Sequence, residues 1–290
     1  MIRYDNKLWF RHITSFRKTD TLRVLLPEIL VIGVYSAGLT YLVSNHLDEL
    51  ANLKKALSVH SLIGFVLSLL LVFRTNSAYD KWWEGRKHWG ALINNTRNLA
   101  INLKVLVPQQ KESLSFYQRM IPNYAFALKE HLKDNRILEE LDLKEGEKVW
   151  AEKCDHLPNK IAESLYKETV KLNREGHINN EDMIRLDNEL RALTDITGAC
   201  ERIKNTPIPY SYSLFLKKFI FIYIITLPLG LIPDFSYWTV PLVCFFFYVL
   251  LSLELIAEEI EEPFGYDDND LPTGDMSKKI KVNVAEIMED

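Results

Sequence analysis

Residues 60–90 read HSLIGFVLSLLLVFRTNSAYDKWWEGRKHWG, and their character changes abruptly near the middle. Residues 61–73 form a continuous apolar segment, whereas Arg74, Thr75 and Asn76 are polar. An aromatic and basic group follows: Tyr79, Lys81, Trp82, Trp83, Arg86 and Trp89. Tryptophan and tyrosine favour the membrane–water interface, and lysine and arginine favour its cytoplasmic side. This order predicts a helix that passes from hydrocarbon through lipid headgroups into water.

The apolar segment is short for a membrane span. At about 1.5 Å per residue, residues 61–73 rise about 20 Å, whereas the hydrocarbon core of a bilayer is about 30 Å thick. The helix therefore either continues through Arg74 or ends where protein and water surround it.

The faces of this helix differ. Small residues that let helices approach closely in lipid occupy one side: Ser61, Gly64 and Ser68. Phe65, Leu69 and Phe73 occupy an adjacent side at positions i, i+4 and i+8. These three are either ordinary lipid-facing or core residues, or a hydrophobic constriction that gates a pore by excluding water. Spacing alone favours the first interpretation and does not decide.

The rest of the chain adds further apolar segments around a polar centre. With 48% hydrophobic and 26% charged residues, the composition averages a membrane part with a soluble part. Candidate spans cover residues 22–43, 61–73, 219–233 and 235–253, and Pro228 and Gly230 predict a kink or break in the third. Lysine and arginine adjoin the side that carries both termini, which predicts that this side is cytoplasmic. Residues 74–218 read as long soluble helices.

The predicted organisation has five parts. They are an N-terminal cytosolic arm (1–20), two spans (21–83), a cytosolic helical region (84–210), two further spans (211–256) and an acidic segment with a C-terminal tail (257–290).

Charge, cysteines and histidines exclude several classes of function. A net charge of −4 without a basic stripe argues against nucleic acid as a partner. The cysteines, Cys154, Cys200 and Cys244, are far apart and form no CxxC motif, so we expect buried thiols in a reducing compartment. The seven histidines show no i, i+4 pairing with each other, which predicts hydrogen-bonded or solvated imidazoles rather than metal ligands.

The motifs after the second span carry a family resemblance. The run from Arg74 to Tyr79, the WWEGR of residues 82–86 and the Trp89-Gly90 pair resemble the corresponding segment of bacterial bestrophins. The similarity extends from Trp9 to about Pro272. It implies a pentameric ion channel whose second helix lines a narrow neck, formed here by Phe65, Leu69 and Phe73. The middle position is Leu69 where animal members carry an aromatic ring, so the resemblance does not carry over neck aperture and selectivity. Animal bestrophins are calcium-activated anion channels, whereas bacterial relatives are not uniformly anion-selective, and the resemblance therefore leaves the sign of the permeant ion open.

An acidic run, EEIEEPFGYDDND, occupies residues 258–270. Calcium takes several carboxylate and carbonyl oxygens, although the spacing is not that of an EF-hand and such runs are usually solvated. Pro-Phe-Gly followed by acids is similar to the calcium clasp of animal bestrophins. The resemblance implies side-chain ligands from Asp267 and Asp270 and backbone carbonyls from Glu259 and Glu262. Tyr266 and Asn269 interrupt the acids, so calcium is a candidate ligand rather than a required cofactor.

Residues 200–210, CERIKNTPIPY, connect a soluble helix to the third span. Their two prolines end the preceding helix, because residues before proline avoid helical geometry, and a rigid linker is the simplest interpretation. In bestrophins the corresponding stretch carries a second constriction at the cytosolic mouth. The resemblance assigns this aperture to Ile208, with Thr206 as the alternative. One apolar side chain per subunit would form a size filter.

Together these patterns predict an all-α, four-span helical membrane protein with a large cytosolic helical portion, assembling around a central pore. We expect a homo-oligomer, pentameric by resemblance, in the inner membrane of the cell, with both termini cytoplasmic. Its partners would be membrane lipid and small monovalent ions, either chloride and other anions or sodium-like cations. One alternative is a membrane-anchored binding or scaffold protein without conduction. Another is a metal-dependent membrane enzyme that uses the acids near Asp267, but the sequence offers no nucleophile or base at a recognisable spacing.

Overall fold

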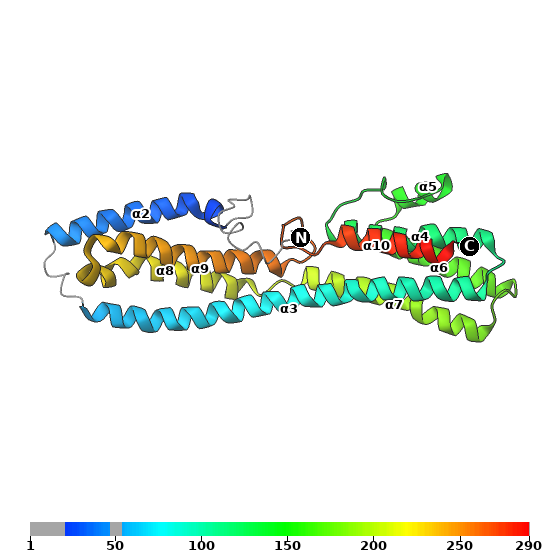
Figure 1. Ribbon diagram of the computed structural model, residues 1–290, viewed down its shortest axis with the longest axis horizontal. Helices are drawn as coiled ribbons and strands as arrows, with labels where there is room; N and C mark the ends of the chain where they lie inside the picture. The colour runs from blue at the N-terminus through cyan, green and yellow to red at the C-terminus, as the bar shows by residue number, and fades with distance from the viewer. Residues whose placement is uncertain (1–20, 47–53, 290) are drawn as a thin grey trace. The chain divides into compact units, whose positions relative to one another are not determined.

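The computed structural model describes residues 21–46 and 54–289, and the predicted arm over residues 1–20 lies outside them. Its elements are all helical (Figure 1): α2 (Thr21–His46), α3 (Lys54–Leu106), α4 (Lys111–Leu132), α5 (Glu145–Lys153), α6 (Leu157–Arg174), α7 (Asn180–Asn205), α8 (Tyr210–Phe235), the 3₁₀ helix η3 (Ser236–Trp238), α9 (Thr239–Glu261) and α10 (Thr273–Met288). Within these described ranges there is no strand. The all-α prediction is confirmed.

Residues 60–90, which predict a helix that leaves the membrane, lie within one unbroken helix. α3 runs for 53 residues, from Lys54 to Leu106, so the change from apolar to polar at Arg74 does not end it. No proline interrupts this helix, and its polar residues are compatible with helical geometry. At about 1.5 Å per residue it is about 80 Å long. The short apolar segment is therefore part of a helix that extends well beyond any hydrocarbon layer.

The contacts of the chain divide it into two compact units. The first, here called the membrane unit, comprises the described residues 21–46, 54–81 and 207–261. The second, here called the helical unit, comprises residues 82–206 and 262–289.

The helices that can cross a bilayer lie wholly or partly in the membrane unit. Three segments of the described chain are long and apolar enough to do so, Thr21–Asn45, Leu57–Leu106 and Tyr210–Glu261, and the third contains both α8 and α9. α9 packs against α2 and α8 (Figure 1). The connection between α8 and α9 is η3, where Ser236 has a φ of 49°.

The predicted weak point of the third span is not a break, because α8 continues through Pro228. Gly230 serves a different purpose: a Cβ there would lie 3.4 Å from backbone atoms of Leu57 and 3.3 Å from Nδ1 of His60. The glycine thus allows α3 to approach α8 closely.

The core of the helical unit is built around α4. α10 and α6 pack on it (Figure 1), and Tyr117 and Tyr124 are fully buried within it. Their hydroxyl groups hydrogen-bond to Thr169 and Thr197 at 2.7 and 2.6 Å. Burial raises the pKa of both phenols, so they remain neutral polar links between α4 and its neighbours.

Candidate functional site

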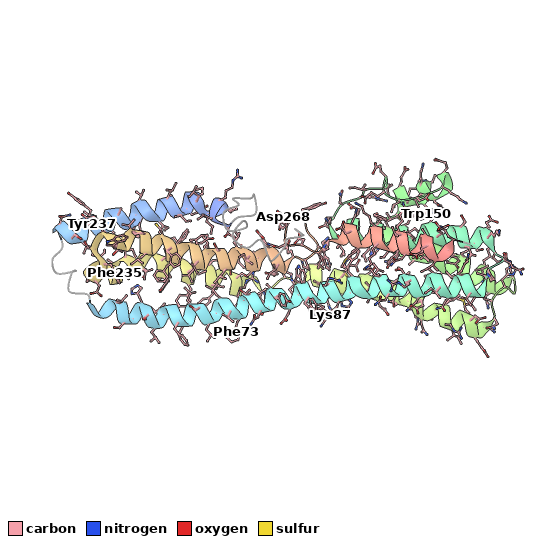
Figure 2. The ribbon with its side chains drawn as sticks, viewed as in Figure 1. Phe73, Lys87, Trp150, Phe235, Tyr237 and Asp268 are labelled. Atoms are coloured by element: carbon pink, nitrogen blue, oxygen red, sulfur yellow. The ribbon has the colours of Figure 1, made fainter. Side chains whose placement is uncertain are left out.

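The predicted neck residues lie on the uncovered face of α3. Phe65, Leu69 and Phe73 are 69%, 46% and 56% exposed, whereas Leu67 and Leu71 are 0% and 1% exposed. At about 100° per residue the two groups lie on opposite sides of the helix. Figure 2 shows Phe73 on the side of α3 away from α8. We call Phe65, Leu69 and Phe73 the neck stripe; it is free to face either lipid or other copies of the chain.

The small residues of α3 meet α8 at Gly64. A Cβ at this position would lie 2.8 Å from the hydroxyl oxygen of Tyr223, so a larger residue would force the Tyr223 side chain or the helix to shift. Nε2 of His60 on α3 lies 3.0 Å from Oγ1 of Thr226 on α8. Ser61 and Ser68 line a cavity of about 290 Å³ next to this contact. The packing against α8 thus fixes which face of α3 stays uncovered.

A buried ion cluster lies below the neck stripe. Arg74 is 1% exposed, its Nη2 lies 2.7 Å from Oε2 of Glu261, and its Nε lies 3.7 Å from Oε2 of Glu254. Lys81 adds a second cation 3.6 Å from Glu261. Buried charges persist only when they are paired, so Arg74 joins α3 to α9. These ion pairs hold the Arg74 side chain against α9, so Arg74 braces α3 where its apolar segment ends.

Glu261 also reaches the predicted aperture. Its Oε1 accepts a hydrogen bond from the backbone N–H of Ile208 at 2.6 Å. The Ile208 side chain is half-buried, whereas the alternative, Thr206, is exposed. Ile208 belongs to the membrane unit, and Thr206 belongs to the helical unit. Sequence reasoning did not identify Glu254 and Glu261 as partners of Arg74. Their position gave a signal for such a pairing, because acids at the end of an apolar helix usually face protein or water.

The acidic loop after α9 folds around Asp270. This side chain is 3% exposed, and its Oδ2 accepts a hydrogen bond from the backbone N–H of Asp267 at 2.6 Å. Burial raises the pKa of Asp270 to about 6. A Cβ on Gly265 would lie 2.9 Å from the same Oδ2, so the glycine leaves room for the carboxylate.

Two sequence motifs meet at this loop. Phe264 packs on Gly85, where a Cβ would lie 3.0 Å from its ring, and Trp82 Nε1 donates to the carbonyl of Asn269 at 3.0 Å. Leu271 N–H donates to the carbonyl of Pro263 at 2.9 Å. The Pro-Phe-Gly and Trp-Trp-Glu-Gly motifs are therefore the two sides of one contact.

The loop's donor set fits a hard cation in part. Oδ1 of Asp270 is buried and has no hydrogen-bond partner among the described residues, which is the state of an oxygen suited to calcium. The exposed Asp267 side chain and the carbonyl of Glu262 belong to the same loop. Glu259 lies in the last turn of α9, in the membrane unit. Three of the four predicted ligands thus come from the one loop that follows α9.

Comparison with known proteins identifies the fold and the family. Residues 1–286 match the family described as Bacterial/Fungal Bestrophin protein. The chain is 36% identical over 235 residues to a voltage-dependent anion channel-forming protein of Nostoc sp., covering 77% of this chain and 75% of the relative. It is 29% identical over 286 residues to a protein of the same description from Ralstonia nicotianae, covering 97% and 92%.

A solved structure gives the same result. The crystal structure of a bacterial bestrophin homologue from Klebsiella pneumoniae superposes with a TM-score of 0.84 and 25% identity, covering 91% of this chain and 98% of that one. The bestrophins are membrane ion channels rather than enzymes, which removes the metal-dependent enzyme from the alternatives. The chain belongs to the bacterial and fungal bestrophin family.

Proposed function

We propose that this chain is the subunit of a homopentameric anion channel in the inner membrane of the cell. The observation that carries the proposal is the neck stripe, an apolar and exposed face on the helix that the family resemblance assigns to the pore. The relatives described as voltage-dependent anion channel-forming proteins support anions over sodium-like cations.

Symmetry explains how an apolar stripe can serve conduction. The membrane unit has a second exposed apolar surface on α2, formed by Leu30, Val31 and Val34. A ring of copies turns one such surface to lipid and the other to a shared axis. In this arrangement the neck stripe of each copy contributes to a constriction that conducts when it is wetted or widened.

The proposed ion path has a second narrow point at Ile208. Ile208, held at its backbone by Glu261, contributes one apolar side chain per copy to a size filter on the cytoplasmic side. Neither constriction offers a charged cage, so selectivity arises from aperture and from nearby fields. Both termini and the helical unit lie in the cytoplasm, in keeping with the basic residues next to the spans.

Calcium is the proposed ligand of the acidic loop. Asp267 and Asp270 would supply carboxylate oxygens, and Glu259 and Glu262 would supply backbone carbonyls. The unpartnered Oδ1 of Asp270 supports this assignment.

Single-channel recording of purified protein in planar bilayers under asymmetric potassium chloride tests conduction and ion sign together. An anion channel gives a reversal potential near the chloride equilibrium potential, and a cation channel gives one near that of potassium. Absence of current under every voltage and calcium concentration favours the scaffold alternative. Native mass spectrometry of the same preparation measures the number of 33.8 kDa subunits.

A further inference from the structure

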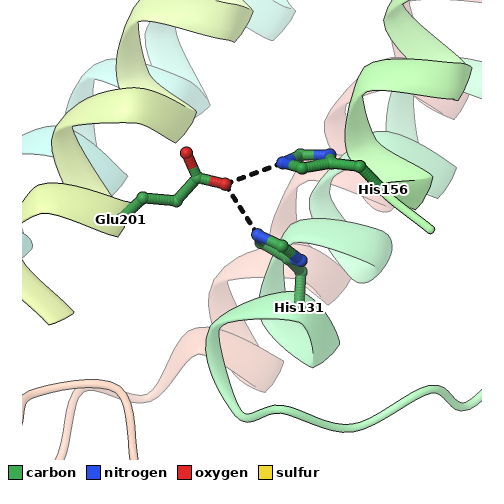
Figure 3. A group of neighbouring side chains, drawn as sticks. All are labelled: His131, His156 and Glu201. Carbon is green, nitrogen blue, oxygen red and sulfur yellow. Dashed lines mark hydrogen bonds and ion pairs between the residues drawn. The ribbon is translucent and has the colours of Figure 1, made fainter. Parts of the chain in front are cut away.

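Three helices of the helical unit bring together side chains that the channel proposal does not use. His131 lies in the last turn of α4, His156 is the N-cap of α6, and Glu201 lies near the end of α7. Nε2 of each histidine lies 2.7 Å from Oε1 of Glu201, and the two imidazole rings are 4.2 Å apart between centroids. Figure 3 shows both rings directed at the same carboxylate oxygen.

The separations are close to those of a metal-binding triad. One ligand atom from each residue lies within 4.8 Å of the other two. In a tetrahedral zinc site, with metal–ligand distances of about 2.0–2.2 Å, neighbouring ligand atoms are about 3.3 Å apart. Each histidine nitrogen therefore has to move only a few tenths of an ångström from Glu201 to admit an ion between them.

The surroundings give an ion both access and a place for water. The three side chains are 29–30% exposed, so the site is neither sealed nor fully solvated. His131 also lines a cavity of about 320 Å³ together with Asp134 and Asp155. Three protein ligands with an open fourth position occupied by water are an established arrangement for zinc.

We propose that His131, His156 and Glu201 form a binding site for a divalent transition metal ion of the zinc class. Two imidazole nitrogens and one carboxylate select zinc, cobalt or nickel over calcium and magnesium, which prefer oxygen ligands. The bound ion ties the end of α4, the start of α6 and the end of α7 together. This site is separate from the acidic loop in its residues and in the ion it takes.

The metal-free hydrogen bonds predict how binding proceeds. Nδ1 of His156 accepts a hydrogen bond from the backbone N–H of Asn159 at 3.2 Å, so the ring proton resides on Nε2 and is donated to Glu201. A metal ion at Nε2 displaces this proton, and the ring then carries its proton on Nδ1. The cap hydrogen bond to Asn159 is exchanged for the metal bond.

The experiment uses full-length protein without a polyhistidine tag, purified in detergent and stripped with chelator. Cobalt chloride is titrated first, because tetrahedral Co²⁺ gives a visible absorption band whose intensity reports the number of bound ions. Competition with zinc chloride then gives the zinc affinity. We expect one equivalent per chain, no sulfur-to-cobalt charge-transfer band, and no competition by calcium chloride.

Matched variants separate metal binding from structure. His156→Asn removes the imidazole but keeps a residue type that caps helices well, and Glu201→Gln removes the charge with little change of shape. Each should weaken zinc binding at least about tenfold, because even changes beyond the ligands have such effects. His177→Ala, which removes an exposed histidine outside the triad, should leave the affinity unchanged.

Two results overturn the assignment. One is zinc affinity that is equal in the wild type, His156→Asn and Glu201→Gln proteins while all three melt normally. The other is cobalt binding that is lost in His177→Ala or in an acidic-loop variant instead. If a triad variant melts early, Glu201→Asp, which keeps a carboxylate, must restore cobalt binding for the proposal to stand.

Discussion

The carboxylate of Glu261 links Arg74 to the backbone of Ile208. Its Oε2 lies 2.7 Å from Nη2 of Arg74, and its Oε1 accepts the N–H of Ile208 at 2.6 Å. One side chain at the end of α9 thus holds α3 and the predicted aperture segment at the same point. A disturbance of this carboxylate should affect both.

Arg74→Met should destabilise the protein strongly. It leaves Glu254 and Glu261 buried with fewer countercharges, and breaking a buried ion pair costs about 3–5 kcal/mol. Thermal melting in detergent measures the loss. Lys217→Met, which breaks the exposed pair with Glu258, should cost less than about 1 kcal/mol. Equal melting temperatures for the two variants would show that Arg74 does not brace α3.

Leu69→Ala should increase ion flux into liposomes with little change in melting temperature, because it widens the proposed constriction without touching the core of the unit. Leu71→Ala lies half a helical turn away and is buried, so it should cost about 2–5 kcal/mol instead. Val34→Ala on exposed α2 is the control for a lipid-facing change. Flux that rises equally in Leu69→Ala and Val34→Ala would contradict the pore assignment of the neck stripe.

Gly85→Ala should loosen the acidic loop. Its added Cβ would meet the Phe264 ring at 3.0 Å and Leu271 at 3.3 Å, so the loop must shift, at a cost of about 1–3 kcal/mol. Proteolysis of the loop and thermal melting measure this effect. Gly146→Ala in α5, where no atom lies within 4 Å of the added Cβ, should be neutral or slightly stabilising.

Calcium should raise the melting temperature of the wild type but not of Asp270→Ala, because an ion that binds only the folded state stabilises it. Differential scanning fluorimetry with calcium chloride, with chelator and with magnesium chloride measures the shift. Glu286→Gln, an exposed acid on α10, is the control. An undiminished calcium shift in Asp270→Ala would remove the acidic loop as the site.

The pair formed by Arg119 and Glu147 should make stability depend on pH. Burial alone would raise the pKa of Glu147, but hydrogen bonds from Arg119 and the backbone of Lys144 outweigh it and place the pKa below its ordinary value of 4.5. The stabilisation is therefore complete above about pH 4.5 and is lost as the pH falls through the folded-state pKa.

Glu147→Gln tests this dependence directly. It should cost about 2 kcal/mol at pH 7, as expected for hydrogen bonds to a charged group, and progressively less below pH 4.5. Melting curves of wild type and variant across this range measure the difference. If the difference in stability between the wild type and Glu147→Gln stays constant down to the lowest pH at which both proteins fold, the charge of Glu147 contributes nothing to stability.

Several features could be read from the sequence because they depend on local composition. The apolar run before Arg74 and the aromatic and basic residues after it predicted a helix that leaves the membrane, and α3 is that helix. The motifs from Arg74 to Gly90 were sufficient to indicate the family that the comparison establishes. Helical period also placed Phe65, Leu69 and Phe73 on one face, since this follows from geometry alone.

Only the tertiary structure decided which partners lie across that helix. Tyr223 packs on Gly64 and covers one face of α3, while the neck stripe stays uncovered. Arg74 forms an ion pair with Glu261, which is distant in the sequence. His131, His156 and Glu201 form no recognisable sequence motif, because they are far apart in the chain. Glu201 is 70 residues from His131 and 45 residues from His156. Hydrophobicity and helical period are properties of neighbouring residues, whereas paired charges and converging ligands depend on how distant helices pack.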